Sequence, residues 1–196
     1  EAQMVMQDLR GSPWWGNFEL DPFVMATFGS FRDYVRNCTT QNVVLVYFAG
    51  HSGEGGELCF CMDKTGSTMQ MLGPDFVAPC IASASKNAST RARGGTIECV
   101  VLNSCHTRAL GLALRDRGVM HVVCWHRKVK DATAAKFAEE FFKQLVVHPT
   151  DYAGAFEAGC VEVRRVDSDA ADGLCFFSTD FEKDIKKDDV WIYSGG

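Results

Sequence analysis

The chain has 196 residues, of which 46% are hydrophobic and 23% are charged, a balance typical of a globular protein and unlike that of disordered, collagenous or coiled-coil chains. Its 20 basic and 25 acidic side chains give a net charge of -5, which offers no basic field for nucleic acid or for an anionic membrane. No apolar stretch reaches 18 residues, so we expect no membrane partner and no signal peptide.

The spacing of apolar residues predicts alternating helices and strands. A helix carrying Phe28, Phe31, Tyr34 and Val35 on one face precedes a continuous apolar strand at residues 43–48. Residues 58–62 alternate as in a half-buried strand or hairpin arm, and the small, polar and basic residues 83–95 predict a mobile surface loop. Further strands are predicted at residues 97–102, 121–125 and 173–177. Further helices are predicted at residues 107–117 and after the N-cap candidates Asp131 and Asp151. This order predicts a single α/β domain, residues 1–196, with a mostly parallel sheet.

The nine cysteines indicate a reducing environment. Nine is odd, so they cannot all pair with one another, and most lie in apolar runs where free Cys packs as a small hydrophobe. No CxxC pair is present, and we expect neither a metal nor a cofactor. We therefore expect an intracellular, cytoplasmic location. The chain begins with Glu1 rather than Met, and we interpret it as a fragment or a processed chain.

Reactive side chains follow two of the predicted strands. His51 lies three residues after the strand at 43–48, and Cys105 lies three residues after the strand at 97–102. Ligands bind beyond the carboxyl ends of open parallel sheets, so neighbouring strands, about 4.8 Å apart, would bring imidazole and thiol together. A thiolate is a strong nucleophile, a nearby His supplies the base, and a helix starting after Cys105 favours the thiolate. The alternative is a core cysteine and a hydrogen-bonded histidine without a catalytic role. His106 is expected to point away from Cys105.

The motifs around these residues resemble those of a known family. The segments YFAGHSG and VVLNSCHT are similar to the His and Cys motifs of caspase-like cysteine peptidases, and the separation of 54 positions from His51 to Cys105 is close to the spacing of about 50 in caspases. NSCHT resembles the metacaspase form, which usually has Asp in place of Asn103. The run VVCWHRKVKDATAAKFAEEFFKQL, followed by AFEAGC and VRR, resembles the CHAT domain, a caspase-like module related to separase. The resemblance extends over residues 28–177.

The resemblance implies a caspase-like three-layer α/β/α sandwich with His51 as base and Cys105 as nucleophile. It also implies an oxyanion hole from the backbone N–H of Cys105 and one N–H in the Ser52–Gly53 turn. A basic substrate side chain would be held by Asn103 and Asp131, since separase-like relatives use an acidic residue in this region. Two residues depart from the family pattern: Ser52 follows the His where Gly is usual, and Asn103 replaces an acid. The first strand of the fold is expected to be missing.

Three functions remain open at this point. The first is an intracellular cysteine endopeptidase acting on a protein or peptide, the effector domain of a larger chain whose other domains activate it. The second is a catalytically inactive CHAT-like scaffold that signals by binding. The third is a metal-dependent protein that uses His51 and Cys105 as ligands.

Overall fold

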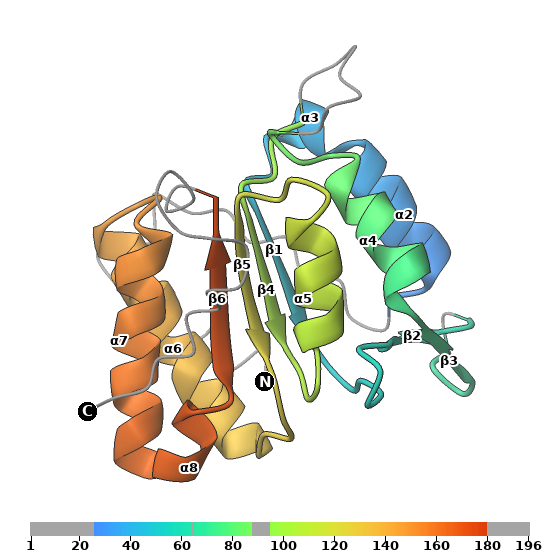
Figure 1. Cartoon of the computed structure of the whole chain (residues 1–196). Helices are drawn as coiled ribbons and strands as arrows, with labels where there is room; N and C mark the ends of the chain where they lie inside the picture. The colour runs from blue at the N-terminus through green and yellow to red at the C-terminus, as the bar shows by residue number, and fades with distance from the viewer. Residues whose placement is uncertain (1–25, 64, 88–94, 180–196) are drawn as a thin grey trace.

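The computed structural model of the chain describes residues 26–63, 65–87 and 95–179 (Figure 1). At its centre lies a four-stranded sheet in the order β1-β4-β5-β6. Neighbouring strands among the first three pair in parallel, and β6 runs antiparallel to β5. The strands are β1 Leu45–Ala49, β4 Cys99–Asn103, β5 His121–Trp125 and β6 Leu174–Ser178. The predicted α/β class with a mostly parallel central sheet is therefore confirmed.

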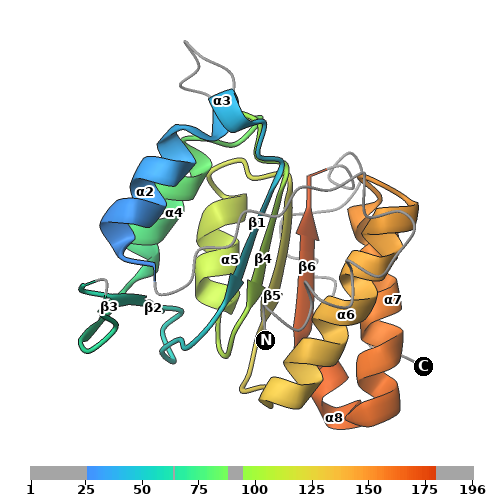
Figure 2. The ribbon, with the colours of Figure 1, turned by 180° about the vertical axis from the view of Figure 1, so that it is seen from behind.

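Helices cover both faces of this sheet (Figures 1 and 2). The helices on one side are α2 Phe28–Arg36, α3 Cys38–Gln41, α4 Pro74–Ala82 and α5 Arg108–Arg115; those on the other are α6 Asp131–Val147, α7 Tyr152–Val166 and α8 Ser168–Ala171. Strand β4 is buried along its whole length because its side chains alternate between the two cores: Val100 packs toward α5, and Val101 packs toward α6 and α7. This double burial explains the continuous apolar runs in the sequence.

A second, two-stranded antiparallel sheet joins β2 Leu58–Cys61 to β3 Met69–Leu72. The predicted hairpin arm is confirmed by β2, in which Leu58 and Phe60 are buried. The expected alternation of Leu58, Phe60 and Met62 with the two cysteines fails at the end of the strand: Cys61 is buried, and Met62, beyond the strand, is 61% exposed. Neither β3 nor α4 was predicted from the sequence.

The two aspartates expected to cap helices behave differently. Asp151 is the N-cap of α7, and its carboxylate accepts a hydrogen bond from the Gly154 N–H at 2.9 Å. The prediction for Asp131 is wrong by one residue: the N-cap of α6 is Lys130, and Asp131 is the first helical residue. The helix dipole still stabilises a carboxylate in the first turn. As the first helical residue, however, Asp131 does not take the N-cap role.

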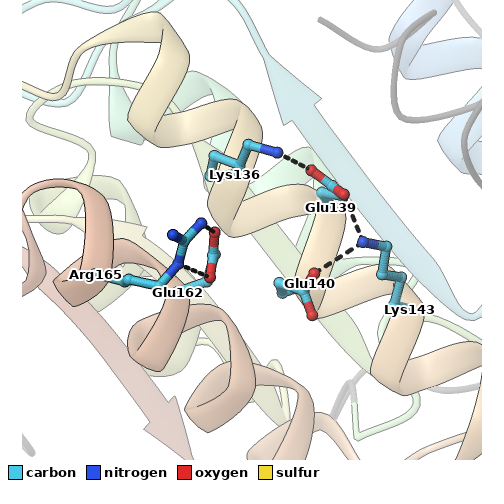
Figure 3. A network of polar contacts seen from close by, with 6 residues as sticks. All are labelled: Lys136, Glu139, Glu140, Lys143, Glu162 and Arg165. Atoms are coloured by element: carbon cyan, nitrogen blue, oxygen red, sulfur yellow. Dashed lines mark hydrogen bonds and ion pairs between the residues drawn. The ribbon is translucent and has the colours of Figure 1, made fainter.

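The long helices α6 and α7 pack closely through a glycine. A Cβ built at Gly159 would lie 2.6 Å from the Phe137 ring, so only a residue without a side chain fits there. Oppositely charged side chains pair along each of the two helices (Figure 3). In α6, hydrogen bonds from Lys136 and Lys143 hold the pKa of Glu139 below its ordinary value.

Two sequence predictions fall partly or wholly outside the described residues. In the predicted loop, Ser85 is buried and pairs with Ile97, while residues 88–94 lie outside the described part. The expected absence of a first strand concerns residues before 26, which also lie outside it.

All nine cysteines are free thiols. Three are half-buried, namely Cys59, Cys80 and Cys105, and the other six are buried. Burial raises the pKa of the Cys160 thiol to about 12. It also raises the pKa of Cys99, which the nearby Glu98 raises further.

Candidate active site

The carboxyl ends of β1 and β4 bring the two predicted reactive residues together. The strands are neighbours, with Ala49 opposite Asn103, and His51 and Cys105 each follow two residues later. The offset is two residues rather than the predicted three because both strands end one residue later than expected. Both residues line one pocket of about 290 Å³, at the edge of the sheet where ligands of parallel sheets bind.

The same pocket gathers most of the other predicted site residues. Ser52, Asn103 and Asp131 line it together with His51 and Cys105. They come from three segments that are far apart in the sequence: the loop after β1, the end of β4 and the start of α6. Gly53 is the one predicted site residue that does not line this pocket.

The Cys105 thiol lies against the backbone of Val129, in the segment between β5 and α6. The Val129 N–H donates to the sulfur at 3.4 Å, and the thiol lies 3.5 Å from the Val129 carbonyl oxygen, to which it donates. Within the described ranges, no hydrogen bond joins the His51 ring to the Cys105 sulfur. Proton transfer between the two side chains therefore requires the S–H group to turn from Val129 toward the exposed His51.

Buried hydrogen bonds fix the loop that carries Cys105. The hydroxyl of Thr107 contacts the carbonyl oxygens of Leu102 at 3.2 Å and Ser104 at 3.0 Å, and it accepts the Trp125 N–H at 3.1 Å. Thr107 is also the N-cap of α5, without a side-chain capping bond. The loop is thus tied to strand β5, and α5 begins three residues after the thiol.

Two serine hydroxyls join this loop to the His51 loop. The Ser104 hydroxyl donates to the Gly50 carbonyl at 2.6 Å and lies 2.7 Å from the Ser52 hydroxyl. The Ser52 hydroxyl in turn donates to the carbonyl of Cys105. Ser104 is only 3% exposed, so water has little access to these bonds.

The predicted oxyanion hole needs one correction. The Gly53 N–H donates to the Glu57 carbonyl at 2.9 Å and closes the turn that leads into β2, so it is not free to bind a substrate oxygen. The turn itself is stabilised by the His51 carbonyl, which accepts the Cys59 N–H at 3.0 Å. Of the two residues predicted in this turn, Ser52 alone lines the pocket.

Asn103 lies at the pocket wall, but its amide is engaged elsewhere. The side-chain nitrogen donates to the Tyr47 hydroxyl and to the Ala134 carbonyl, both at 2.8 Å, and the side-chain oxygen accepts the Trp125 indole N–H at 2.8 Å. Asn103 is 2% exposed. It therefore joins β1, β5 and α6 behind the pocket, whereas the exposed Asp131 faces solvent at its rim.

Sequence reasoning missed several residues that line the pocket, among them His106, Lys128 and Val129. His106 was expected to point away from Cys105, yet it lines the pocket, with a left-handed φ of 53° and its N–H bonded to the Arg127 carbonyl at 3.2 Å. Lys128 also lines the pocket, and Val129 acts through its backbone. The segment between β5 and α6 has no periodicity that could have indicated this role.

Comparisons with known proteins do not identify this site. A search with protein-family models finds no match to the chain, and a search of curated proteins finds none either. In the part of the chain that the structure describes, no three His, Cys, Asp or Glu side chains are placed to hold a metal ion. Among those same residues, none of the helices has the length and apolar character needed to span a membrane.

Proposed function

We propose that this chain is a cysteine endopeptidase in which His51 and Cys105 form the catalytic dyad. The observation that carries the proposal is the pairing of β1 with β4, whose adjacent ends deliver both residues to one pocket. Helices on both faces of the sheet support a caspase-like three-layer sandwich of the CHAT kind. The sequence motifs around the two residues support the same assignment.

In this proposal His51 takes the thiol proton, and the Cys105 sulfur attacks the carbonyl carbon of the scissile peptide bond. A C–S bond forms, and the carbonyl electron pair moves to the oxygen, to which the backbone N–H groups of Cys105 and Ser52 would donate. The C–N bond then breaks as the imidazolium gives its proton to the leaving amine. A water molecule, deprotonated by His51, hydrolyses the thioester and restores the thiol.

The substrate would be a protein or peptide with a basic residue before the cleaved bond. Asp131 supports this assignment because it is an exposed carboxylate at the rim of the pocket. A carboxylate paired with a guanidinium forms a charge-assisted hydrogen bond, which is stronger than a bond between neutral groups. Both amide N–H groups of Asn103 already donate hydrogen bonds within the protein. In this proposal Asn103 therefore supports the pocket wall and does not bind the substrate.

One observation favours the second candidate, an inactive CHAT-like scaffold. In the structure the Cys105 thiol forms its hydrogen bonds with the Val129 backbone rather than with His51. For the peptidase, the same contact describes a resting state that an activating domain of the parent chain would release. The nine free cysteines support a reducing, cytoplasmic site of action.

Covalent labelling separates the two candidates. An acyloxymethyl ketone probe with Arg next to the reactive group should label the wild-type protein at Cys105, and labelling should disappear in Cys105→Ala and fall strongly in His51→Ala. Cys80→Ala is the matched control, because Cys80 is also a half-buried free thiol but lies in α4. Labelling that persists in Cys105→Ala, or that is equally slow with and without His51, would reject the peptidase and favour the scaffold.

A further inference from the structure

Four oxygen atoms form a continuous chain between the two loops of the candidate site. They belong to the Gly50 carbonyl, the Ser104 hydroxyl, the Ser52 hydroxyl and the Cys105 carbonyl, in that order. Carbonyls only accept hydrogen bonds, so the Ser52 proton goes to the Cys105 carbonyl. The single proton of Ser104 is then shared between the Gly50 carbonyl and the Ser52 hydroxyl oxygen. The chain is buried at Ser104 and half-buried at Ser52.

This chain brackets His51. Ser104 contacts the residue before His51 through the Gly50 carbonyl, and it contacts the residue after His51 through the Ser52 hydroxyl. Ser104 itself directly precedes Cys105. The other backbone bonds of the His51 loop run to the turn and strand that follow it, through the His51 carbonyl and the Gly53 N–H. Those bonds shape the turn, but they do not tie it to the loop of Cys105.

We propose that Ser104 is a positioning residue that sets the separation between His51 and Cys105. The inference rests on the proposed function, because it gives Ser104 a role only through that dyad. Ser104 makes no contact with a substrate in this scheme. Its hydroxyl holds the backbone on both sides of the imidazole, so that the ring can reach the sulfur once the thiol turns from Val129.

The chain offers a closely matched control at the other end of the same strands. The Thr96 hydroxyl donates to the Val43 carbonyl at 2.6 Å, the same distance and the same kind of bond as between Ser104 and Gly50. Both bonds join the segment around β4 to the segment around β1. Thr96→Val therefore removes an equivalent bond from the fold without touching the site.

The test is the rate at which iodoacetamide alkylates Cys105 from pH 5 to 9, followed by mass spectrometry of the peptide that carries it. Loss of one hydrogen bond of ordinary strength predicts alkylation about tenfold slower at pH 7 in Ser104→Ala. Ser52→Ala keeps the bond from Ser104 to Gly50 and should slow alkylation less. Thr96→Val should melt at a temperature similar to that of Ser104→Ala while keeping the wild-type rate and pH profile.

A double-mutant cycle distinguishes positioning from general damage to the fold. If Ser104 acts through His51, adding Ser104→Ala to His51→Ala should slow alkylation no further than His51→Ala alone. Additive losses, or a wild-type rate in Ser104→Ala while His51→Ala is slow, would overturn the inference and leave the dyad intact. A wild-type rate in His51→Ala would overturn the proposed dyad itself, and the role of Ser104 with it.

Discussion

Replacing Asn103 by Ala should destabilise the protein severely, because three elements depend on its amide. The substitution leaves the buried Trp125 indole N–H without its partner and removes the bond to the half-buried Tyr47. It also removes the side-chain bond to the Ala134 carbonyl, which lies within helix α6 and keeps its helical hydrogen bond. An unsatisfied buried polar group such as the Trp125 N–H costs about 1–3 kcal/mol, and each of the two other lost hydrogen bonds costs about 0.5–1.5 kcal/mol, so the three losses together cost about 2–6 kcal/mol. That is a large share of the roughly 5–15 kcal/mol that stabilises an ordinary domain.

Guanidinium denaturation, followed by tryptophan fluorescence and by circular dichroism, measures this loss. The exposed Asn87→Ala serves as control and should change the unfolding free energy by less than about 0.5 kcal/mol. A loss below about 1 kcal/mol in Asn103→Ala, with an unchanged dependence on denaturant, would refute the view that this amide supports the pocket.

Asn103→Asp tests the same reasoning with the residue that metacaspases usually have. An ionised Asp accepts the Trp125 bond but faces the Ala134 carbonyl with a second acceptor. Burial, with one oxygen facing the Ala134 carbonyl, should raise the folded-state pKa of the new carboxyl above its unfolded value, so the variant should lose stability as pH rises through the folded pKa. Equal or greater stability than wild type at pH 7 would contradict the hydrogen-bond assignment.

Three further predictions concern specificity and stability. Asp131→Ala should reduce the preference for Arg or Lys over Asp before the cleaved bond by roughly ten- to a hundredfold, and more than Asn103→Ala does; an unchanged profile on a peptide panel would remove Asp131 from the pocket. Gly159→Ala should lower the free energy of unfolding by about 1–3 kcal/mol, because the added Cβ would clash with the Phe137 ring, even though Ala is the better helix former. A raised melting temperature would contradict this packing. Glu139→Gln should cost up to about 1 kcal/mol at pH 7 in low salt. The pKa of Glu139 is lowered by folding, so its contribution is present above the unfolded value of about 4.5 and should vanish as pH falls through the folded pKa; a difference that persists at pH 2 would refute the ion-pair origin.

The sequence predicted the elements whose surroundings impose a simple pattern. Strand β5 was predicted with its observed bounds, because a strand covered on both faces must be apolar throughout. That His51 and Cys105 line one pocket was predicted for a related reason: the ends of neighbouring parallel strands meet at one edge. The cap at Asp151 followed from local hydrogen bonding that needs no tertiary context.

Elements that break the usual patterns could not be predicted in this way. Helix α4 contains Pro79, which normally argues against a helix, and strand β3 exposes Met69 and Met71 rather than burying them. In the site, Val129 contacts the Cys105 thiol through its backbone N–H and carbonyl. Because the contact does not involve the side chain, the residue type at this position gives no sign of it. Whether the Gly53 N–H is free for a substrate oxygen depends on how the following turn closes, and the presence of a glycine alone does not determine that.

The nine cysteines differ in burial, so their reaction with a thiol reagent can show where the fold opens. A reagent that reacts with thiols can reach the three half-buried cysteines in the native state, whereas the six buried ones become accessible only when the fold opens around them. Five of those six lie in the two cores, on both sides of the sheet, and the sixth, Cys61, lies in β2. The rate at which each buried cysteine is alkylated therefore measures the opening free energy of the layer that contains it. No label has to be introduced into the protein.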